Sequence, residues 1–260
     1  MAGRQAPEPT GPAGPAGARM RLNRFLALCG VASRRGAMEI VFAGRVRINE
    51  RAVTDPGETV VIGRDRVTLD GERLRPPTRW SYFAFHKPRG VIVTAHDEQG
   101  RASLAPLLQR LPAHVRPVGR LDRGSEGLLL LTDHGDLANR LLHPRSGIEK
   151  VYRVRVMPCP RRGQIAQLER GVPLGQGEWS GPARVRIKRA LRRAAVLSVT
   201  ISEGKKREVR RMCRSVGLRV MRLRRVAFAG LRLDDLAPGA VRPLEPQEIE
   251  HLLRVTRLAP

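Results

Sequence analysis

Residues 117–135, which read PVGRLDRGSEGLLLLTDHG, decide how the rest of the chain is interpreted. The four consecutive leucines Leu128–Leu131 predict a strand that is buried on both faces. A polar loop precedes this strand and places Asp122 between Arg120 and Arg123. Because a polar loop held against a buried strand is a common position for a functional group, Asp122 is a candidate catalytic carboxylate. Taken alone, an Asp flanked by arginines is more typical of an ion pair on the surface.

The charge of the chain indicates a polyanionic partner. Its 260 residues include 49 Lys and Arg against 24 Asp and Glu, which gives a net charge of +25. Neutralisation of phosphates by such an excess drives nucleic-acid binding. The sequence contains no apolar run of about 18 residues and no basic-then-apolar leader. We therefore expect a soluble, cytoplasmic protein that does not bind a membrane.

The metal-binding and nucleotide-binding motifs that would imply a cofactor are missing from the sequence. Cys29, Cys159 and Cys213 are far apart and form no C-x-x-C pair. The histidines form no H-x-x-x-H pair, and no G-x-x-x-x-G-K-[ST] loop is present. We expect an activity that needs neither a metal nor another cofactor.

The first 75 residues predict a tail followed by a small domain. Residues 1–19 are rich in Pro, Gly and Ala, and this composition predicts a disordered tail. Two short helices are expected next, the first one ending at Gly30 and the second one capped by Ser33. Short strands are expected around residues 46–49, 60–61 and 67–69, with a tight turn at Asp70-Gly71.

This small domain carries a basic surface and resembles a known RNA-binding module. The stretches LNRFL, GVASRR and GRVRIN resemble the αL RNA-binding domain of the fourth small-subunit ribosomal protein, over residues 20–75. The start of the second helix adds backbone N–H groups that favour phosphate. The resemblance implies RNA contacts at five arginines: Arg24, Arg34, Arg35, Arg45 and Arg47. A solvated basic face on a structural domain is the alternative interpretation.

Residues 76–80 predict a linker, and residues 81–253 a second domain followed by a tail at 254–260. Tyr82–His86 is predicted to be a strand that continues through a turn into a hairpin arm at residues 91–93. Asp133 is expected to cap a helix that presents Leu137, Leu141 and Leu142 on its apolar face. Helices and strands do not alternate regularly, so the α+β class is favoured over a doubly wound fold.

Three motifs of the second domain resemble the pseudouridine synthases that act on ribosomal RNA and carry the αL domain in front. They are GRLD at the loop described above, KVYRV at residues 150–154 and EGKKREVRRM at residues 203–212. The resemblance implies a largely antiparallel central sheet flanked by helices. It makes Asp122 the catalytic carboxylate and places Tyr152 under the target base.

The third motif is expected to supply a basic partner for the catalytic carboxylate. We assign Arg210 to this role, because a nearby guanidinium keeps an Asp ionised and holds its geometry. The remaining basic side chains of the two loops are expected to contact RNA, namely Arg120, Arg123, Lys205 and Arg207. Glu208 departs from the family, which has a Gln at this position, and Lys206 and Asp133-His134 are further departures.

The predicted reaction converts uridine to pseudouridine in ribosomal RNA, with the large subunit favoured and a monomer expected. Asp122 could attack C1′ of the ribose or remove a ribose proton to give a glycal, and the sequence leaves both routes open. The alternative function is a non-catalytic, ribosome-associated RNA-binding factor. This alternative hypothesis leaves all three motifs of the second domain without a role.

Overall fold

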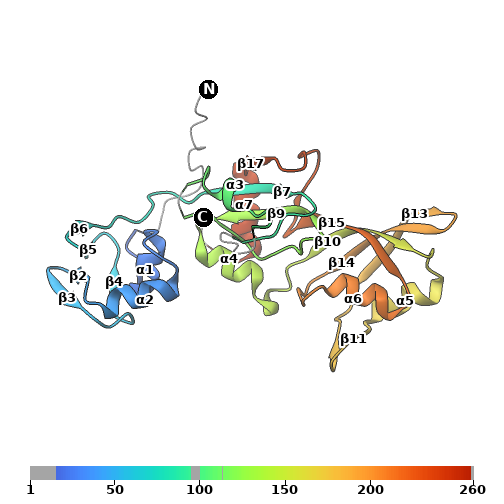
Figure 1. Cartoon of the computed structure of the whole chain (residues 1–260), viewed down its shortest axis with the longest axis horizontal. Helices are drawn as coiled ribbons and strands as arrows, with labels where there is room; N and C mark the ends of the chain where they lie inside the picture. The colour runs from blue at the N-terminus through green and yellow to red at the C-terminus, as the bar shows by residue number, and fades with distance from the viewer. Residues whose placement is uncertain (1–15, 95–99, 113, 259–260) are drawn as a thin grey trace.

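The computed structural model describes residues 16–94, 100–112 and 114–258 and separates them into two parts (Figure 1). The N-terminal part holds two helices and six short strands. Ser33 caps α2 by accepting a hydrogen bond from the Gly36 amide at 3.1 Å, as predicted. The elements of this part are β1 (Arg19–Arg21), α1 (Leu22–Leu28), α2 (Arg34–Phe42), β2 (Val46–Ile48), β3 (Arg51–Val53), β4 (Thr59–Val61), β5 (Val67–Leu69) and β6 (Glu72–Arg73).

The C-terminal part is built on a nine-stranded sheet, in which seven strands run in the order β13-β14-β10-β15-β9-β7-β17. All its pairings are antiparallel except the one between β9 and β15, so the predicted α+β class with a largely antiparallel sheet is confirmed. The strands are β7 (Tyr82–Lys87), β8 (Arg116–Pro117), β9 (Glu126–Thr132), β10 (Lys150–Met157), β11 (Pro173–Gly175), β12 (Glu178–Trp179), β13 (Arg184–Leu191), β14 (Ala194–Ile201), β15 (Arg219–Phe228), β16 (Leu231–Arg232) and β17 (Val241–Pro243). The helices are α3 (Ala105–Leu108), α4 (Gly135–Leu142), the 3-10 turn η1 (Pro144–Ser146), α5 (Arg162–Arg170), α6 (Glu208–Ser215) and α7 (Pro246–Val255).

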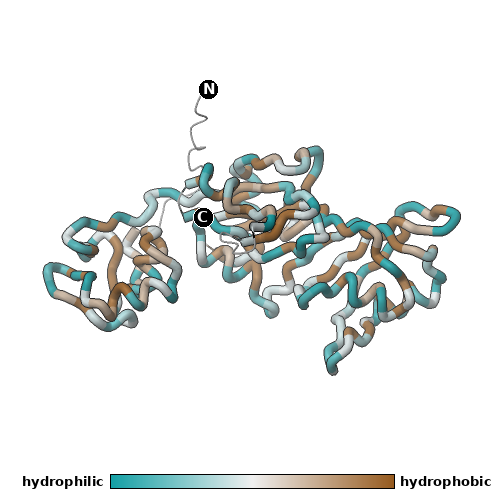
Figure 2. Tube along the Cα trace, in the orientation of Figure 1, coloured by the Kyte–Doolittle hydropathy of each residue, from teal (hydrophilic) through white to brown (hydrophobic). Residues whose placement is uncertain are grey.

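β9 is the central strand, and all four of its leucines are fully buried, as the sequence predicts. Leu128 and Leu130 pack on one face with residues of α4 and α7. Leu129 and Leu131 pack on the other face with the region around α3. Figure 2 shows the corresponding hydrophobic colour along the centre of this part. A strand buried on both faces fixes the loop that precedes it, which is the loop that carries Asp122.

The other half of the sheet is covered on one face only. Val154, Leu197 and Leu223 contribute to a core that also contains Leu168 of α5 and Met212 of α6. Within the described ranges, no helix is long and apolar enough to cross a membrane.

Several sequence-based expectations about elements are wrong. Residues 91–93 form no hairpin arm, because β7 pairs with β9 and β17 and only an isolated bridge joins Ile92 to Ser103. Asp133 does not cap α4, since its carboxylate accepts a hydrogen bond from the Ser81 amide at 2.7 Å. Leu142 is about half exposed instead of lying on the buried face.

The predicted domain limits also need correction at two points. Residues 1–15 of the predicted tail lie outside the described residues, but Arg19 already belongs to β1 and pairs with Val61. At the other end, α7 continues to Val255, and the Thr256 hydroxyl donates to the Leu252 carbonyl at 2.7 Å. The predicted C-terminal tail therefore begins inside a helix, with residues 259–260 outside the described range.

Candidate active site

The loop that carries Asp122 is fastened to the sheet at both ends. The Val118 amide donates to the Leu130 carbonyl at 2.8 Å, and a turn closes where the Ser125 amide donates to the Asp122 carbonyl at 2.9 Å. A third bond joins the Gly90 amide to the Arg123 carbonyl at 2.8 Å. The backbone of Asp122 is thereby fixed, while its carboxylate keeps about a third of its surface exposed. This combination suits a group that must meet a substrate in a defined place.

The charged neighbour of the Asp122 carboxylate is Arg207. Its Nη1 lies 3.9 Å from Oδ2 of Asp122. Arg210, which we predicted to pair with Asp122, instead donates from Nη2 to the Gly124 carbonyl at 2.7 Å. The predicted ion pair between Arg210 and Asp122 is therefore not formed. Arg210 nevertheless stays close enough for the charge of Asp122 to act on the Arg210 guanidinium and raise the pKa of Arg210. Burial and the neighbouring Arg207 outweigh that effect and lower the pKa of Arg210.

A buried lysine that the sequence analysis did not single out lies beside the same loop. Lys87 ends β7 with no exposed surface, and its Nζ donates to the carbonyls of Pro88 at 3.0 Å and Ser125 at 2.9 Å. Desolvation lowers the pKa of Lys87 to about 8, against the charges of Asp122 and Glu126, which raise it. From the sequence, position 87 is assigned to the turn that follows the strand predicted at Tyr82–His86. The one signal that could have indicated a buried lysine is its position directly after an apolar strand.

Tyr152 lies in the row of the sheet that begins at the base of the Asp122 loop. It faces Arg225 on β15, and Arg225 faces Gly127 on β9. The Tyr152 ring is half-buried against the core shared with α5 and α6. The Nε of Arg225 donates to the Leu128 carbonyl at 2.8 Å and ties the row together. Tyr152 is thus one intervening strand away from the strand that Asp122 precedes.

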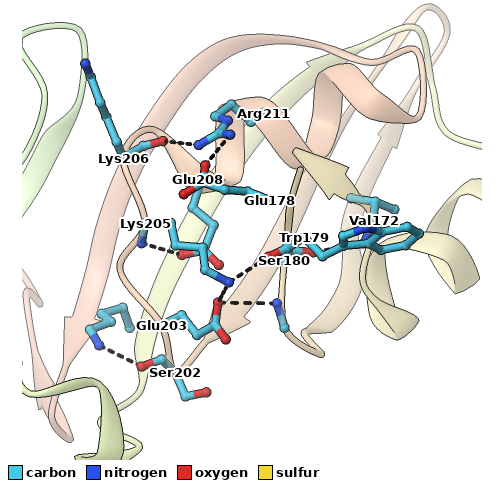
Figure 3. A network of polar contacts seen from close by, with 12 residues as sticks. Val172, Glu178, Trp179, Ser180, Ser202, Glu203, Lys205, Lys206, Glu208 and Arg211 are labelled. Carbon is cyan, nitrogen blue, oxygen red and sulfur yellow. Dashed lines mark hydrogen bonds and ion pairs between the residues drawn. The ribbon is translucent and has the colours of Figure 1, made fainter. Parts of the chain in front are cut away.

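The segment before α6 is held by a network of polar contacts (Figure 3). The Lys205 amide donates to the Glu208 carboxyl at 3.0 Å. The Lys205 ammonium group pairs with Glu203 at 2.6 Å and donates to the Trp179 carbonyl at 2.6 Å. Arg211 donates to the Lys206 carbonyl at 3.3 Å. With both flanks fixed, Arg207 adopts a left-handed backbone conformation, with φ of +53°, and its side chain extends toward Asp122.

Burial of Glu208 gives this network an unusual protonation state. Desolvation, with a smaller contribution from the hydrogen-bonded Glu203, raises the pKa of Glu208 to about 7, against the bond from the Lys205 amide, which lowers it. The bond to Lys205 lowers the pKa of Glu203. Below about pH 7 the more buried carboxyl group therefore holds the proton, and the more exposed one carries the charge.

The predicted RNA-contacting residues fall into two groups. Six have partners within the protein: Arg24 with Asp136 (2.6 Å), Arg45 with Asp70 (Nε–Oδ1, 3.0 Å), Arg47 with the Glu50 carbonyl (2.9 Å), Arg123 with the Gly90 carbonyl (3.3 Å), and Lys205 and Arg207 as described above. Arg34, Arg35 and Arg120 are exposed and have no such partner in the described part of the chain. Arg24 joins the two parts of the molecule, because Asp136 belongs to α4.

A second contact joins the two parts at Gly30. Its φ of +75° is a left-handed conformation, and a Cβ there would lie 1.7 Å from the His114 ring. Only glycine suits both the helix end and this close approach. Together with Arg24 and Asp136, this contact sets the N-terminal part against the side of the sheet that bears α4.

Comparison with known proteins identifies the families to which the two parts of the chain are similar. Residues 81–215 match the family described as RNA pseudouridylate synthase, and residues 20–65 match the S4 domain. The chain belongs to the RNA pseudouridylate synthase family. The chain is 38% identical over 237 residues to the ribosomal large subunit pseudouridine synthase B of Bacillus subtilis, covering 89% of this chain and 95% of the relative. An uncharacterised RNA pseudouridine synthase of Aquifex aeolicus is 36% identical over 240 residues, covering 92% and 96%.

The fold of this pseudouridylate synthase is also found among solved structures. A crystal structure of a pseudouridylate synthase superposes with a TM-score of 0.65 and 29% identity, over 90% of this chain and 99% of that one. An S4 domain followed by a synthase domain agrees with the family resemblance and with an RNA substrate. Among the described residues, no group of three or more His, Cys, Asp or Glu side chains could hold a metal ion.

Proposed function

We propose that this chain isomerises uridine to pseudouridine in the RNA of the large ribosomal subunit, with Asp122 as the catalytic carboxylate. The observation that carries the proposal is a fixed, partly exposed carboxylate with a guanidinium 3.9 Å away. The relative from Bacillus subtilis and another from Vibrio cholerae, 33% identical over 253 residues, are both ribosomal large subunit pseudouridine synthases B, which supports the large subunit as the source of the substrate. Ribosomal RNA as substrate in turn favours a cytoplasmic enzyme, and we propose that it acts as a monomer without a metal.

The chemistry needs one ionised carboxylate and a surface that retains the base. The bond from C1′ to N1 of uracil breaks, the base turns, and C5 is joined to C1′, with the C5 proton lost and N1 protonated. Atoms and electrons balance without an oxidant, so we propose that no cofactor takes part. Asp122 either attacks C1′ or removes a ribose proton to give a glycal, and both routes suit its position.

Three side chains are proposed to support Asp122. Arg207 orients the carboxylate by electrostatic attraction from 3.9 Å. Arg210 fixes the loop through the Gly124 carbonyl instead of contacting Asp122. The target nucleotide must leave its helix to reach the carboxylate, and Tyr152 provides a ring against which the flipped base stacks.

The two parts of the molecule divide binding and catalysis between them. We propose that residues 20–75 bind RNA, with Arg34 and Arg35 at the start of α2 facing phosphates. Residues 76–80 connect this domain to the catalytic domain, for which we propose residues 81 to about 258 on the basis of α7. Arg120 and Arg123, beside the catalytic loop, are proposed to hold the phosphates that flank the target.

A pseudouridine map of ribosomal RNA tests this proposal. RNA from cells with and without the gene is compared, and the deleted strain is complemented by the wild type or by Asp122→Asn. We expect one or a few large-subunit sites to disappear and to return only with the wild type. An unchanged map, with RNA binding retained by the purified protein, would favour a non-catalytic RNA-binding factor instead.

A further inference from the structure

The half of the sheet formed by β13, β14, β10 and β15 has one face that no helix covers. On the covered face, Val154, Val199 and Leu223 are buried against α5 and α6. The residues that alternate with them point to the opposite face and are exposed, as Arg153 and Arg155 of β10 show. Because side chains alternate along a strand, the pattern separates a packed face from an open one.

The open face carries rows of arginines that continue from strand to strand. In one row Arg186 faces Ser198, which faces Arg153, which faces Arg224. In the next row Arg189 faces Val196, which faces Arg155, which faces Arg222. Directly paired residues project to the same side of a sheet, so these six arginines share one surface. We call it the arginine face. With strands about 4.8 Å apart, each row spans roughly 14 Å.

Little within the protein neutralises the arginine face. The four strands contain no Asp or Glu. Arg222 pairs with Glu126 at 2.7 Å, whereas Arg153, Arg155, Arg186 and Arg189 have no ion-pair or hydrogen-bond partner among the described residues. The buried Nε of Arg224 also has no acceptor there. Like charges on neighbouring strands are destabilising, so the rows cost stability unless an anion meets them.

We propose that the arginine face binds the phosphate backbone of the RNA segment next to the target uridine. The proposal deepens the function proposed above and rests on it for the identity of the RNA. Guanidinium groups bind phosphates through paired hydrogen bonds, and a face of arginines with few apolar side chains lacks the hydrophobic centre of a protein interface. Phosphate is therefore a better match than an acidic protein.

The position of the arginine face fits an RNA that crosses the whole molecule. Figure 1 places β13 at the opposite end from α1 and α2 of the S4 domain. The rows reach β9 at Glu126, which faces Arg224 and lies four residues after Asp122. The arginine face therefore adjoins the strand that follows the catalytic loop, on the sheet face opposite the one that packs Tyr152. An RNA held by both the S4 domain and the arginine face would have its target nucleotide fixed from two directions.

A matched pair of triple variants tests the proposal. The test variant is Arg153→Gln/Arg155→Gln/Arg186→Gln. The control variant is Arg162→Gln/Arg170→Gln/Arg214→Gln, which removes the same charge from exposed positions on α5 and α6, over the opposite face. The dissociation constant for a large-subunit RNA fragment is measured at several salt concentrations. Equal circular-dichroism spectra and thermal transitions establish that both variants are folded.

We expect the test variant to bind roughly 10- to 100-fold more weakly near 0.1 M salt. The slope of log K against log salt concentration should fall by about two to three, because each lost phosphate contact contributes about 0.7 to 0.9. The control should stay within about twofold of the wild type, since a basic face without a ligand contributes only weak, long-range attraction. Equal losses in both variants, or no loss in the test variant, would overturn the proposal.

Two further measurements separate the remaining outcomes. Photo-crosslinks from RNA to the wild-type protein should map to peptides of β10 and β13, and crosslinks confined to the S4 domain and the catalytic loop would contradict the proposal without any variant. Normal binding of the test variant to naked RNA, with weak binding to ribosomal particles, would assign the face to a protein and also overturn it. Pseudouridine formation by the wild type is followed in parallel. If it is absent while the binding loss persists, the proposed reaction fails and the RNA-binding face stands.

Discussion

Replacing Glu208 by Gln should stabilise the catalytic domain at alkaline pH. Glu208 is 4% exposed, and its carboxyl group accepts the Lys205 amide at 3.0 Å. Burial raises the pKa of Glu208 from 4.5 to about 7. The folded protein therefore binds the proton more tightly than the unfolded chain does. The contribution of this proton to the free energy of unfolding is fully present below pH 4.5 and is lost as the pH rises through about 7.

The size of this effect follows from the shift in pKa. A change of about 2.5 pK units corresponds to roughly 3 kcal/mol of unfolding free energy once Glu208 is fully ionised. Gln has nearly the same shape and keeps an oxygen that can accept the Lys205 amide, but it cannot ionise. The wild type should therefore lose about 2.5 kcal/mol relative to Glu208→Gln between pH 5 and pH 8, because the unfolded chain ionises from pH 4.5 and the folded protein from about pH 7. Glu203, whose pKa is lowered, stays ionised throughout this window.

Denaturant unfolding followed by tryptophan fluorescence measures this difference. The chain has two tryptophans, Trp80 and Trp179, and both pack or lie within the C-terminal part, so the signal reports that part alone. Glu250→Gln on the exposed side of α7 is the matched control and should show no such trend. Parallel pH profiles for the wild type and Glu208→Gln would refute the reasoning. They would mean that the Glu208 carboxyl is not desolvated in the folded protein.

Three further substitutions test the geometry around the catalytic loop. Gly127→Ala should destabilise the protein by about 3 kcal/mol or more in denaturant unfolding. Gly127 has a φ of +113°, and a Cβ there would lie 2.2 Å from the Arg225 carbonyl oxygen. A loss below about 1 kcal/mol would contradict this close approach. Tyr152→Phe should keep most of the single-turnover rate and Tyr152→Ala should lose most of it, since stacking needs only the ring; equal rates would show that the ring does not meet the base. Arg207→Gln should slow turnover with little effect on stability. Arg210→Gln should also lower the free energy of unfolding by about 1 to 2 kcal/mol, because the Gly124 carbonyl loses its donor. The reverse pattern would restore Arg210 as the partner of Asp122.

Local patterns predicted those elements whose environment is encoded in neighbouring residues. The leucine run of β9 and the Ser33 cap of α2 were both predicted correctly. In each case a periodic pattern or a capping side chain lies within one element. The family resemblance then supplied Asp122, which composition alone could not distinguish from a surface residue.

The features that could not be predicted depend on pairing between distant segments. Residues 91–93 are apolar enough for a strand, but β9 and β17 already occupy both edges of β7. Arg207 and Arg210 are three residues apart in a run of basic side chains. In the structure Arg207, in a left-handed conformation, reaches Asp122, while Arg210 is bound to the Gly124 carbonyl. The arginine face likewise emerges only when the register of four strands is known.

Single-turnover conversion of a large-subunit RNA transcript tests whether Asp122 is the catalytic carboxylate of this pseudouridine synthase. Purified wild type and Asp122→Asn are compared at saturating enzyme, with binding affinity measured on the same RNA. We expect pseudouridine at a defined site with the wild type, none with Asp122→Asn, and similar affinity for both. Conversion by Asp122→Asn at the wild-type rate would contradict this expectation.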